Sequence, residues 1–308
     1  MDRISPPLGL SPSSIGEGGV VIMDLDSLIP VKPVGGGSVT EVIQVQDEET
    51  GGLYALKLAK AESPFPTEIG THFLQAEAQA HQLVRKSKSP FFQNLVRDGS
   101  QELPGFLLLQ WLEGKTLRNA LNQNGPLEVS EAVGLCRQIA QALAAMHQAG
   151  LAHGDIHPDN ILLGDDGIDR LIDLGCAHRF DDSAPDYEGL LIGSADYWSP
   201  EACSTNGFAG PETDVFALGV VLFEATAGFR PWPSGSDLRE NIRRRHGDPP
   251  MPLPADRTDI PAGLRQLLDK MLARRLTIRP KSRMVVAELI RLELSLMGAV
   301  ASSSRRAA

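Results

Sequence analysis

The stretch from His153 to Leu163, with the sequence His-Gly-Asp-Ile-His-Pro-Asp-Asn-Ile-Leu-Leu, constrains this chain more than any other. It places the Asp155 carboxylate and the Asn160 carboxamide five positions apart, on a segment that Pro158 stiffens. An apolar run follows at once, and a second acid, Asp173, comes next in the motif Ile-Asp-Leu-Gly. A single Asp-x-Gly usually marks a turn. The two motifs together predict that two acids and an amide converge beside an apolar strand.

Converging carboxylate and amide oxygens are what magnesium-dependent phosphoryl transfer requires. One acid orients the attacking hydroxyl, while the amide and the second acid hold the magnesium ions that neutralise the phosphates. The pattern therefore indicates Asp155 as the acid that handles the hydroxyl proton, and Asn160 with Asp173 as the metal ligands.

The N-terminal third predicts a β-hairpin. Short β-type runs lie on both sides of a Glu-Glu-Thr-Gly-Gly turn within residues 31–58. The hairpin opens with Gly35, Gly36 and Gly37, whose lack of side chains would let backbone N–H groups approach phosphate oxygens. A glycine run alone is more often a flexible turn, and a strand lysine such as Lys57 is by itself only a surface charge.

Helical periodicity follows over residues 68–85, and within this segment Glu77 lies 20 residues after Lys57. Residues 106–114 predict a buried strand that runs into a turn. Later segments predict an amphipathic helix over 130–148 that Ser130 caps, an all-apolar core helix over 213–224, and helices over 264–276 and 282–296. Residues 239–254 predict a surface loop or a short helix.

The motifs as a set resemble the protein kinase superfamily, over about residues 30–290. Small-molecule phosphotransferases of the aminoglycoside kinase-like type share the His-Gly-Asp-x-His-Pro-x-Asn spelling. They lack the downstream set found here, in which Gly193–Glu201 looks like the end of an activation segment. Asp214 stands at the buried acid of the family's central helix, and Arg279 stands at the arginine that pairs with Glu201.

The resemblance implies an α+β fold with two lobes, a small β-rich N-lobe with one main helix and a larger, mostly helical C-lobe. We expect a flexible leader over 1–19, the N-lobe up to the hinge over 20–112, the C-lobe over 113–298 and a disordered tail over 299–308.

The resemblance also implies ATP and magnesium as cofactors, and it gives the residues roles. Asp155 would orient the acceptor hydroxyl or accept its proton, and Asn160 and Asp173 would bind magnesium. Lys57 would contact the phosphates, oriented by Glu77, with Glu68 as the less favoured alternative. His157 stands where serine/threonine-specific members carry a lysine that contacts the γ-phosphate.

A second set would hold the nucleotide. By the resemblance, the ATP-contacting residues are Gly35, Gly36, Gly37, Val42, Ala55, Lys57, Leu109, Gln110, Leu112 and Leu162. Val42, Ala55 and Leu162 would sandwich the adenine, although plain core packing would satisfy the same pattern. Leu109 would guard the back of the pocket, and the Gln110 carbonyl and Leu112 N–H would face the adenine edge. Two positions depart from the family: Thr40 replaces the third glycine, and His81 replaces an aliphatic residue.

We therefore expect a serine/threonine protein kinase that acts on protein substrates. A nucleotide-binding pseudokinase or scaffold, and a small-molecule phosphotransferase, stay open as alternatives. The net charge of −10 argues against a nucleic-acid partner, and no segment is apolar enough to span a membrane. Three cysteines at no metal spacing fit a reducing compartment, so we expect a cytoplasmic protein. The pattern does not indicate an oligomeric state.

Overall fold

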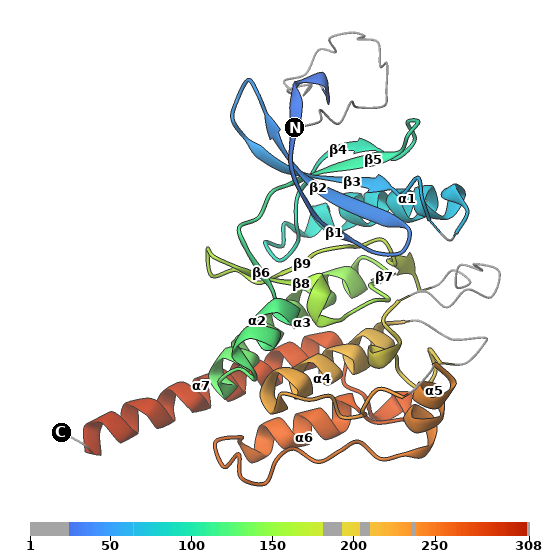
Figure 1. The fold of residues 1–308 in the computed structure, drawn as a ribbon. Coiled ribbons are helices and arrows are strands. Elements are labelled where there is room, and N and C mark those ends of the chain that lie inside the picture. The colour runs from blue at the N-terminus through green and yellow to red at the C-terminus, as the bar shows by residue number, and fades with distance from the viewer. Residues whose placement is uncertain (1–24, 64, 181–192, 204–209, 236–237, 307–308) are drawn as a thin grey trace.

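The structure, a computed structural model, describes residues 25–63, 65–180, 193–203, 210–235 and 238–306. The leader that we expected over 1–19 lies outside the described residues. A small lobe carries a β-sheet and one long helix, and a larger, mostly helical lobe follows it (Figure 1). The α+β fold with two lobes is therefore confirmed.

The sheet of the small lobe is antiparallel, with the strand order β1-β2-β3-β5-β4. Its strands are β1 (Leu28–Gly36), β2 (Thr40–Asp47), β3 (Leu53–Ala59), β4 (Leu95–Gly99) and β5 (Phe106–Gln110). Strands β2 and β3 form the hairpin that the sequence predicted. Asp47 closes its turn, because its carboxylate accepts the Glu49 N–H at 3.0 Å and the Thr50 hydroxyl at 2.8 Å.

Strand β1 forms one edge of this sheet and is exposed along nearly its whole length. Its pairing with β2 is irregular at two points, between Pro30 and Lys32 and between Pro33 and Gly35. Proline has no N–H to donate to a ladder, and each irregularity comes directly after a proline.

Helix α1 (Thr67–Val84) packs against the sheet. Its Leu74 and Ala78 are buried against Ala55 of β3 and against Leu107 and Leu109 of β5. These contacts fix α1 relative to β3, and α1 carries Glu77 while β3 carries Lys57.

The larger lobe contains six helices in the described ranges. They are α2 (Leu117–Asn124), α3 (Val129–Gln148), α4 (Pro211–Ala227), α5 (Leu238–Gly247), α6 (Ala262–Met271) and α7 (Ser282–Arg306). Short strands form two small sheets, β6 (Gly114–Thr116) with β8 (Ile161–Gly164) and β9 (Arg170–Leu171), and β7 (Leu151–Ala152) with β10 (His178–Arg179). The 3-10 turns are η1 (Leu25–Ser27), η2 (Arg85–Ser87), η3 (Pro158–Asn160), η4 (Ala195–Tyr197) and η5 (Leu276–Ile278). Among the described helices, none is long and apolar enough to cross a membrane.

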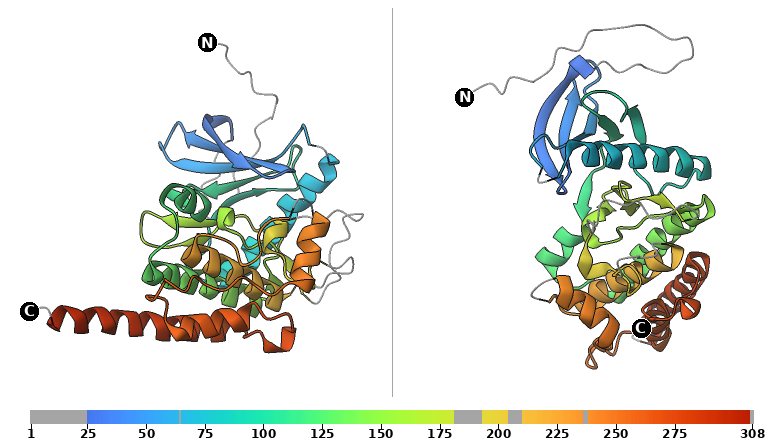
Figure 2. Two further views of the ribbon diagram at one scale, coloured as in Figure 1. Left: turned by 60° about the horizontal axis from the view of Figure 1, so that its bottom comes forward. Right: turned by 90° about the vertical axis from the view of Figure 1, so that its right-hand side faces the viewer.

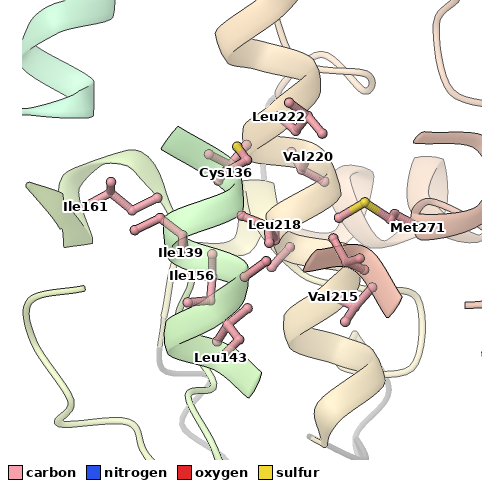
Figure 3. Close-up of a cluster of buried hydrophobic side chains, with 14 of the residues drawn as sticks. Cys136, Ile139, Leu143, Ile156, Ile161, Val215, Leu218, Val220, Leu222 and Met271 are labelled. Carbon is pink, nitrogen blue, oxygen red and sulfur yellow. The ribbon is translucent and has the colours of Figure 1, made fainter. Parts of the chain in front are cut away.

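Helix α4 is the centre of this lobe, and all its residues from Thr213 to Thr226 are buried. Figure 3 shows α3, which carries Ile139 and Leu143, on one side of α4, with Met271 of α6 on the other side. Because α4 is apolar on every side, it must be enclosed by other elements. The sequence prediction of a core helix is confirmed.

Several helix ends differ from the prediction, and two have a clear physical cause. Helix α3 begins after Glu128 and not after Ser130, because the side chains of Glu128 and Glu131 cap each other's backbone N–H groups. Helix α6 ends at Met271, where the chain turns so that Ala273 offers its carbonyl to Arg279 at 2.7 Å.

Helix α7 runs to Arg306, so the disordered tail that we expected over 299–308 is wrong for residues 299–306. The segment Ala299-Val300-Ala301 lies within α7 and contains no proline, and alanine favours continuation of a helix. The left view of Figure 2 shows this helix extending past the rest of the lobe.

A buried ion pair connects two distant parts of this lobe. Arg279 binds Glu201 with two parallel contacts, at 2.5 Å and 2.9 Å, and the Arg279 side chain is fully buried. Its guanidinium also lies 4.8 Å from the centre of the Phe216 ring of α4. The pairing predicted from the sequence is therefore confirmed.

We expect Arg279→Met to lower the free energy of unfolding by about 3–5 kcal/mol, because it leaves the Glu201 carboxylate buried without its partner. Urea denaturation at pH 7 measures the change. Arg291→Met is the matched control, because Arg291 pairs with Glu288 at the surface, where a pair contributes roughly 0–1 kcal/mol.

The same pair predicts a pH dependence. Burial would raise the pKa of Glu201, but Arg279 holds it below its ordinary value of 4.5. The pair therefore stabilises the fold above that value, and its contribution is lost as the pH falls through the lower pKa of the folded state. The difference in the free energy of unfolding between wild type and Arg279→Met should shrink in this acid range. A difference that does not change with pH would contradict the role of the Glu201 charge.

Candidate active site

Lys57 lies between two carboxylates that come from different elements. Its ammonium is 2.6 Å from Glu77 of α1 and 2.7 Å from Asp173, which follows β9. Burial would lower the pKa of Lys57, but Asp173 and Glu77 raise it well above its usual value. Burial likewise opposes the charge on both acids, and Lys57 nevertheless lowers their pKa values. All three groups are charged at neutral pH.

Glu77 connects helix α1 to the segment of the second acid. Its other oxygen accepts the Leu174 backbone N–H at 3.3 Å and lies 3.8 Å from His81 Nε2. Glu68, the alternative partner of Lys57, is exposed on the first turn of α1. The structure therefore brings Glu77 and not Glu68 to Lys57.

Asp155 lies in the loop between β7 and η3, with contacts on both carboxylate oxygens. One oxygen accepts the Ser194 backbone N–H at 3.0 Å. The other lies 3.3 Å from the Asn160 amide nitrogen and 3.3 Å from His157 Nε2. The side chain keeps 17% of its surface exposed, so a hydroxyl group can approach it.

His157 lies between two acids, because its other ring nitrogen is 3.3 Å from Asp159. Burial would lower the pKa of His157, but the hydrogen bonds to Asp155 and Asp159 raise it to about 9. The ring therefore carries a positive charge beside Asp155 at neutral pH. The sequence had left the charge of His157 open, since the ordinary pKa of histidine is near 6.5.

Asp214 of α4 anchors the loop that carries Asp155. Its buried carboxylate accepts the backbone N–H groups of His153 at 2.8 Å and Gly154 at 2.9 Å. His147 of α3 adds a third contact at 2.9 Å. Burial would raise the pKa of Asp214, but these partners lower it. The sequence placed Asp214 correctly but missed His147, which only the crossing of α3 and α4 brings close.

Gly154 is required by the backbone at this loop. Its φ is +80°, and a Cβ atom there would lie 2.8 Å from the Cys176 carbonyl oxygen. Any side chain at position 154 therefore meets both a strained backbone and a fixed backbone atom.

The proposed metal ligands fit magnesium by their chemistry. Asn160 donates its amide N–H to the Asp155 carbonyl at 3.0 Å, which leaves its amide oxygen available as a ligand. The Ile172 N–H binds the Asn160 carbonyl at 3.0 Å, so Asp173 follows directly beside Asn160. Magnesium prefers such carboxylate and amide oxygens and keeps several waters. The residues present therefore fit the cofactor that the resemblance implied.

The apolar residues assigned to adenine lie on adjoining strands. The sheet register places Ala55 opposite Leu109 and Val42 opposite Lys57. Ala55, Leu109 and Leu162 are all buried, and Leu162 lies on β8 of the larger lobe. These positions border the junction of the two lobes, and their contact with adenine stays a prediction.

The hinge shows a contact that the sequence did not predict. The Gln110 carbonyl, assigned to the adenine edge, accepts a hydrogen bond from the Gln93 side chain at 2.7 Å. The Gln110 N–H donates to the Asn94 carbonyl at 2.9 Å, and the two side chains of these residues also bond at 2.8 Å. A carbonyl has two lone pairs, so the Gln110 oxygen can accept a second donor.

The glycine run is tied to the next loop. The Gly37 carbonyl accepts the Lys60 ammonium at 2.7 Å, and the Ser38 carbonyl accepts the Ser63 hydroxyl at 3.1 Å. A Cβ atom at Gly36 would lie 2.4 Å from the Thr40 carbonyl oxygen, so this position must be glycine. Thr40 itself is buried as the first residue of β2.

An ionic cluster borders the loop on the side of α2. Arg118 binds Glu224 at 2.9 Å and Asp159 at 3.4 Å, and it also contacts the Tyr197 hydroxyl. Tyr197 donates to the second Glu224 oxygen at 2.5 Å. No sequence pattern predicts the contacts of Arg118, because its partners lie far away along the chain.

The sequence of this chain is similar to a known protein family and to individual proteins. The Protein kinase domain family matches residues 29–291. Serine/threonine-protein kinase PknL of Mycobacterium bovis is 33% identical over 230 residues, which are 74% of this chain and 56% of that protein. Serine/threonine-protein kinase PknA of Mycobacterium tuberculosis is 29% identical over 252 residues, which are 80% of this chain and 56% of that protein. The chain spans about half the length of these curated relatives.

We expect Gly154→Ala to destabilise the fold by more than Gly167→Ala, its matched control. Gly167 has a similar φ of +78° but nothing within 4 Å of an added Cβ, so that variant should lose only the left-handed backbone preference, about 1–2 kcal/mol. Gly154→Ala adds the clash with Cys176. Urea denaturation measures the free energy of unfolding of both variants. Equal losses would show that the loop accommodates a Cβ atom at position 154 without cost.

His157 should stay protonated across neutral pH and lose its charge only as the pH rises through about 9. Its stabilising contribution is therefore complete below the unfolded pKa near 6.5 and disappears in the alkaline range. NMR titration of the His157 ring measures this, with the urea-unfolded chain as reference. Asp159→Asn should lower the midpoint of the His157 titration, since Asp159 raises the pKa of His157. A wild-type midpoint below 7 would contradict the geometry.

Proposed function

The chain belongs to the protein kinase family, and on that premise we propose that it transfers the γ-phosphate of ATP to serine or threonine hydroxyls of protein substrates, with magnesium as cofactor. One observation carries the proposal. Lys57 bridges Glu77 and Asp173, which joins the small lobe to the metal-binding segment. Phosphoryl transfer depends mostly on positioning and on electrostatic stabilisation, and this arrangement brings the lysine and the acid of the second motif to one place.

The residues then divide the work. Asp155 orients the acceptor hydroxyl and takes its proton, because its carboxylate is held by Ser194 and Asn160 yet is partly exposed. Lys57 binds the phosphates of ATP. Asn160 and Asp173 would hold magnesium, which supplies positive charge against the phosphate oxygens. Gly35, Gly36 and Gly37 would cover the phosphates with their backbone N–H groups.

His157 adds a fixed positive charge near the transferred group. Lysine, the usual residue at this position, is a point charge on a flexible stem. The His157 ring instead is fixed by Asp155 on one side and Asp159 on the other. We therefore assign it a role in binding the γ-phosphate and in restraining the Asp155 carboxylate.

The charge around the acceptor side is balanced. Asp159 and Glu224 would offer a basic substrate residue a partner, but Arg118 binds both acids from within the chain. The acceptor site therefore needs no arginine or lysine immediately beside the phosphorylated residue. Serine and threonine fit the proposal because the relatives are named as serine/threonine-protein kinases.

Neither alternative function gains support. The pseudokinase reading requires the loss of a catalytic or metal-binding residue, whereas Lys57, Asp155, Asn160 and Asp173 are all present. The small-molecule phosphotransferase reading explains neither Glu201 with Arg279 nor the family match. An ATP-rich, reducing compartment such as the cytoplasm would suit the free thiols of Cys136, Cys176 and Cys203.

We expect the purified protein to phosphorylate mixed protein substrates with labelled ATP and magnesium, and phosphoamino-acid analysis to give phosphoserine or phosphothreonine. Asp155→Asn should lower turnover by roughly 10²–10⁴ with unchanged ATP affinity, because only proton handling is lost. Asp173→Ala should lose magnesium-dependent nucleotide binding. Asp165→Asn, an exposed acid nearby, is the matched control. Equal turnover in wild type and Asp155→Asn would overturn the assignment.

A further inference from the structure

Helix α5 carries positive charge in a protein whose net charge is −10. Its sequence, Leu-Arg-Glu-Asn-Ile-Arg-Arg-Arg-His-Gly, contains four arginines against one glutamate. The helix contacts η4, the turn that follows Ser194 and thus the Asp155 carboxylate. A basic helix therefore lies beside the segment that faces the acceptor (Figure 1).

The inner face of α5 is fixed to that segment. Asn241 donates to the Asp196 carboxylate at 3.2 Å, and Arg245 donates to the Asp196 carbonyl at 2.6 Å. Arg245 is buried, and its guanidinium lies 4.5 Å from the centre of the Trp232 ring. Arg244 pairs with Glu240 at 2.5 Å. These two arginines thus have structural partners.

The outer face of α5 presents Arg239, Arg243 and His246. Their spacing places them on one side of the helix, opposite Asn241 and Arg245, and all three are exposed. Within the described ranges, neither Arg239 nor Arg243 forms an ion pair or a side-chain hydrogen bond. Arg274 extends this face, because it binds the Asp248 carbonyl at 2.6 Å just past the end of α5.

We propose that this outer face, formed by Arg239, Arg243, His246 and Arg274, binds an acidic segment of the protein substrate. Unpaired guanidinium groups bind carboxylates bidentately, and complementary charge speeds association. The proposal rests on the kinase function proposed above and adds to it a docking site that contributes to substrate choice.

The geometry also sets the position of the acidic segment. The face lies on the far side of α5 from Asp196, about a helix diameter of 10–12 Å away. An extended chain covers roughly 3.3 Å per residue, so a substrate chain needs roughly three to four residues to cross this width. The docking segment is therefore distinct from the residues next to the acceptor.

Two peptides test the proposal. Both carry one threonine flanked by glycine and alanine, and one adds six glutamates after a ten-residue Gly-Ser linker. At low salt, we expect the acidic tail to lower KM about tenfold without changing kcat, a magnitude that two surface ion pairs can supply. The advantage should shrink in 0.5 M salt. Arg239→Ser combined with Arg243→Ser should abolish the KM advantage of the acidic tail and leave KM and kcat for the tailless peptide unchanged.

Arg85→Ser combined with Lys86→Ser is the matched control, because it removes the same charge from an exposed site at the end of α1. Fluorescence anisotropy with the glutamate tail alone measures docking without catalysis. If neither peptide is phosphorylated but the tail binds through Arg239 and Arg243, the kinase proposal fails and the docking site stands. Equal KM values with no tail binding overturn the docking site, as would tighter binding of an oligonucleotide to the same face.

Discussion

The buried carboxylate of Asp214 is the interaction on which the larger lobe depends. It belongs to an apolar helix, where an unpaired charge would cost several kcal/mol. Two backbone N–H groups of the loop that carries Asp155 and the ring of His147 compensate that charge. The core helix and the loop of Asp155 therefore cannot move independently, since a shift of either would leave the carboxylate unsatisfied. The hydrogen bonds of one buried acid thus determine where the Asp155 loop lies.

A second set of charges, Lys57 with Glu77 and Asp173, connects the two lobes. Glu77 and Asp173 repel each other, and Lys57 between them offsets that repulsion. Because the three groups come from a strand, a helix and a loop, the ion pairs connect the small lobe to the segment that carries Asp173. Such preorganisation lets an enzyme stabilise charge without reorganising its own dipoles during the reaction.

The sequence predicted the elements that follow local rules. The turn of the β2–β3 hairpin, the apolar helix α4 and the spacing from Lys57 to Glu77 are all local or periodic patterns, and the structure has each of them. It failed where competing local signals existed, as at Ser130, which a capping box overrides. It also failed at contacts made only in three dimensions, such as those of Arg118 and Gln93. Periodic sequence patterns do not predict which side chains far apart in the sequence will be in contact.

Strand β1 has a consequence for the solubility of the protein. A sheet edge with exposed Ile29, Val31 and Val34 offers unpaired backbone groups and apolar side chains to any passing strand. Pro30 and Pro33 lie in this edge strand, where proline is tolerated, and the irregular pairing beside both prolines keeps the edge from lying flat. The same two residues that weaken the pairing of β1 thereby protect the molecule against edge-to-edge aggregation.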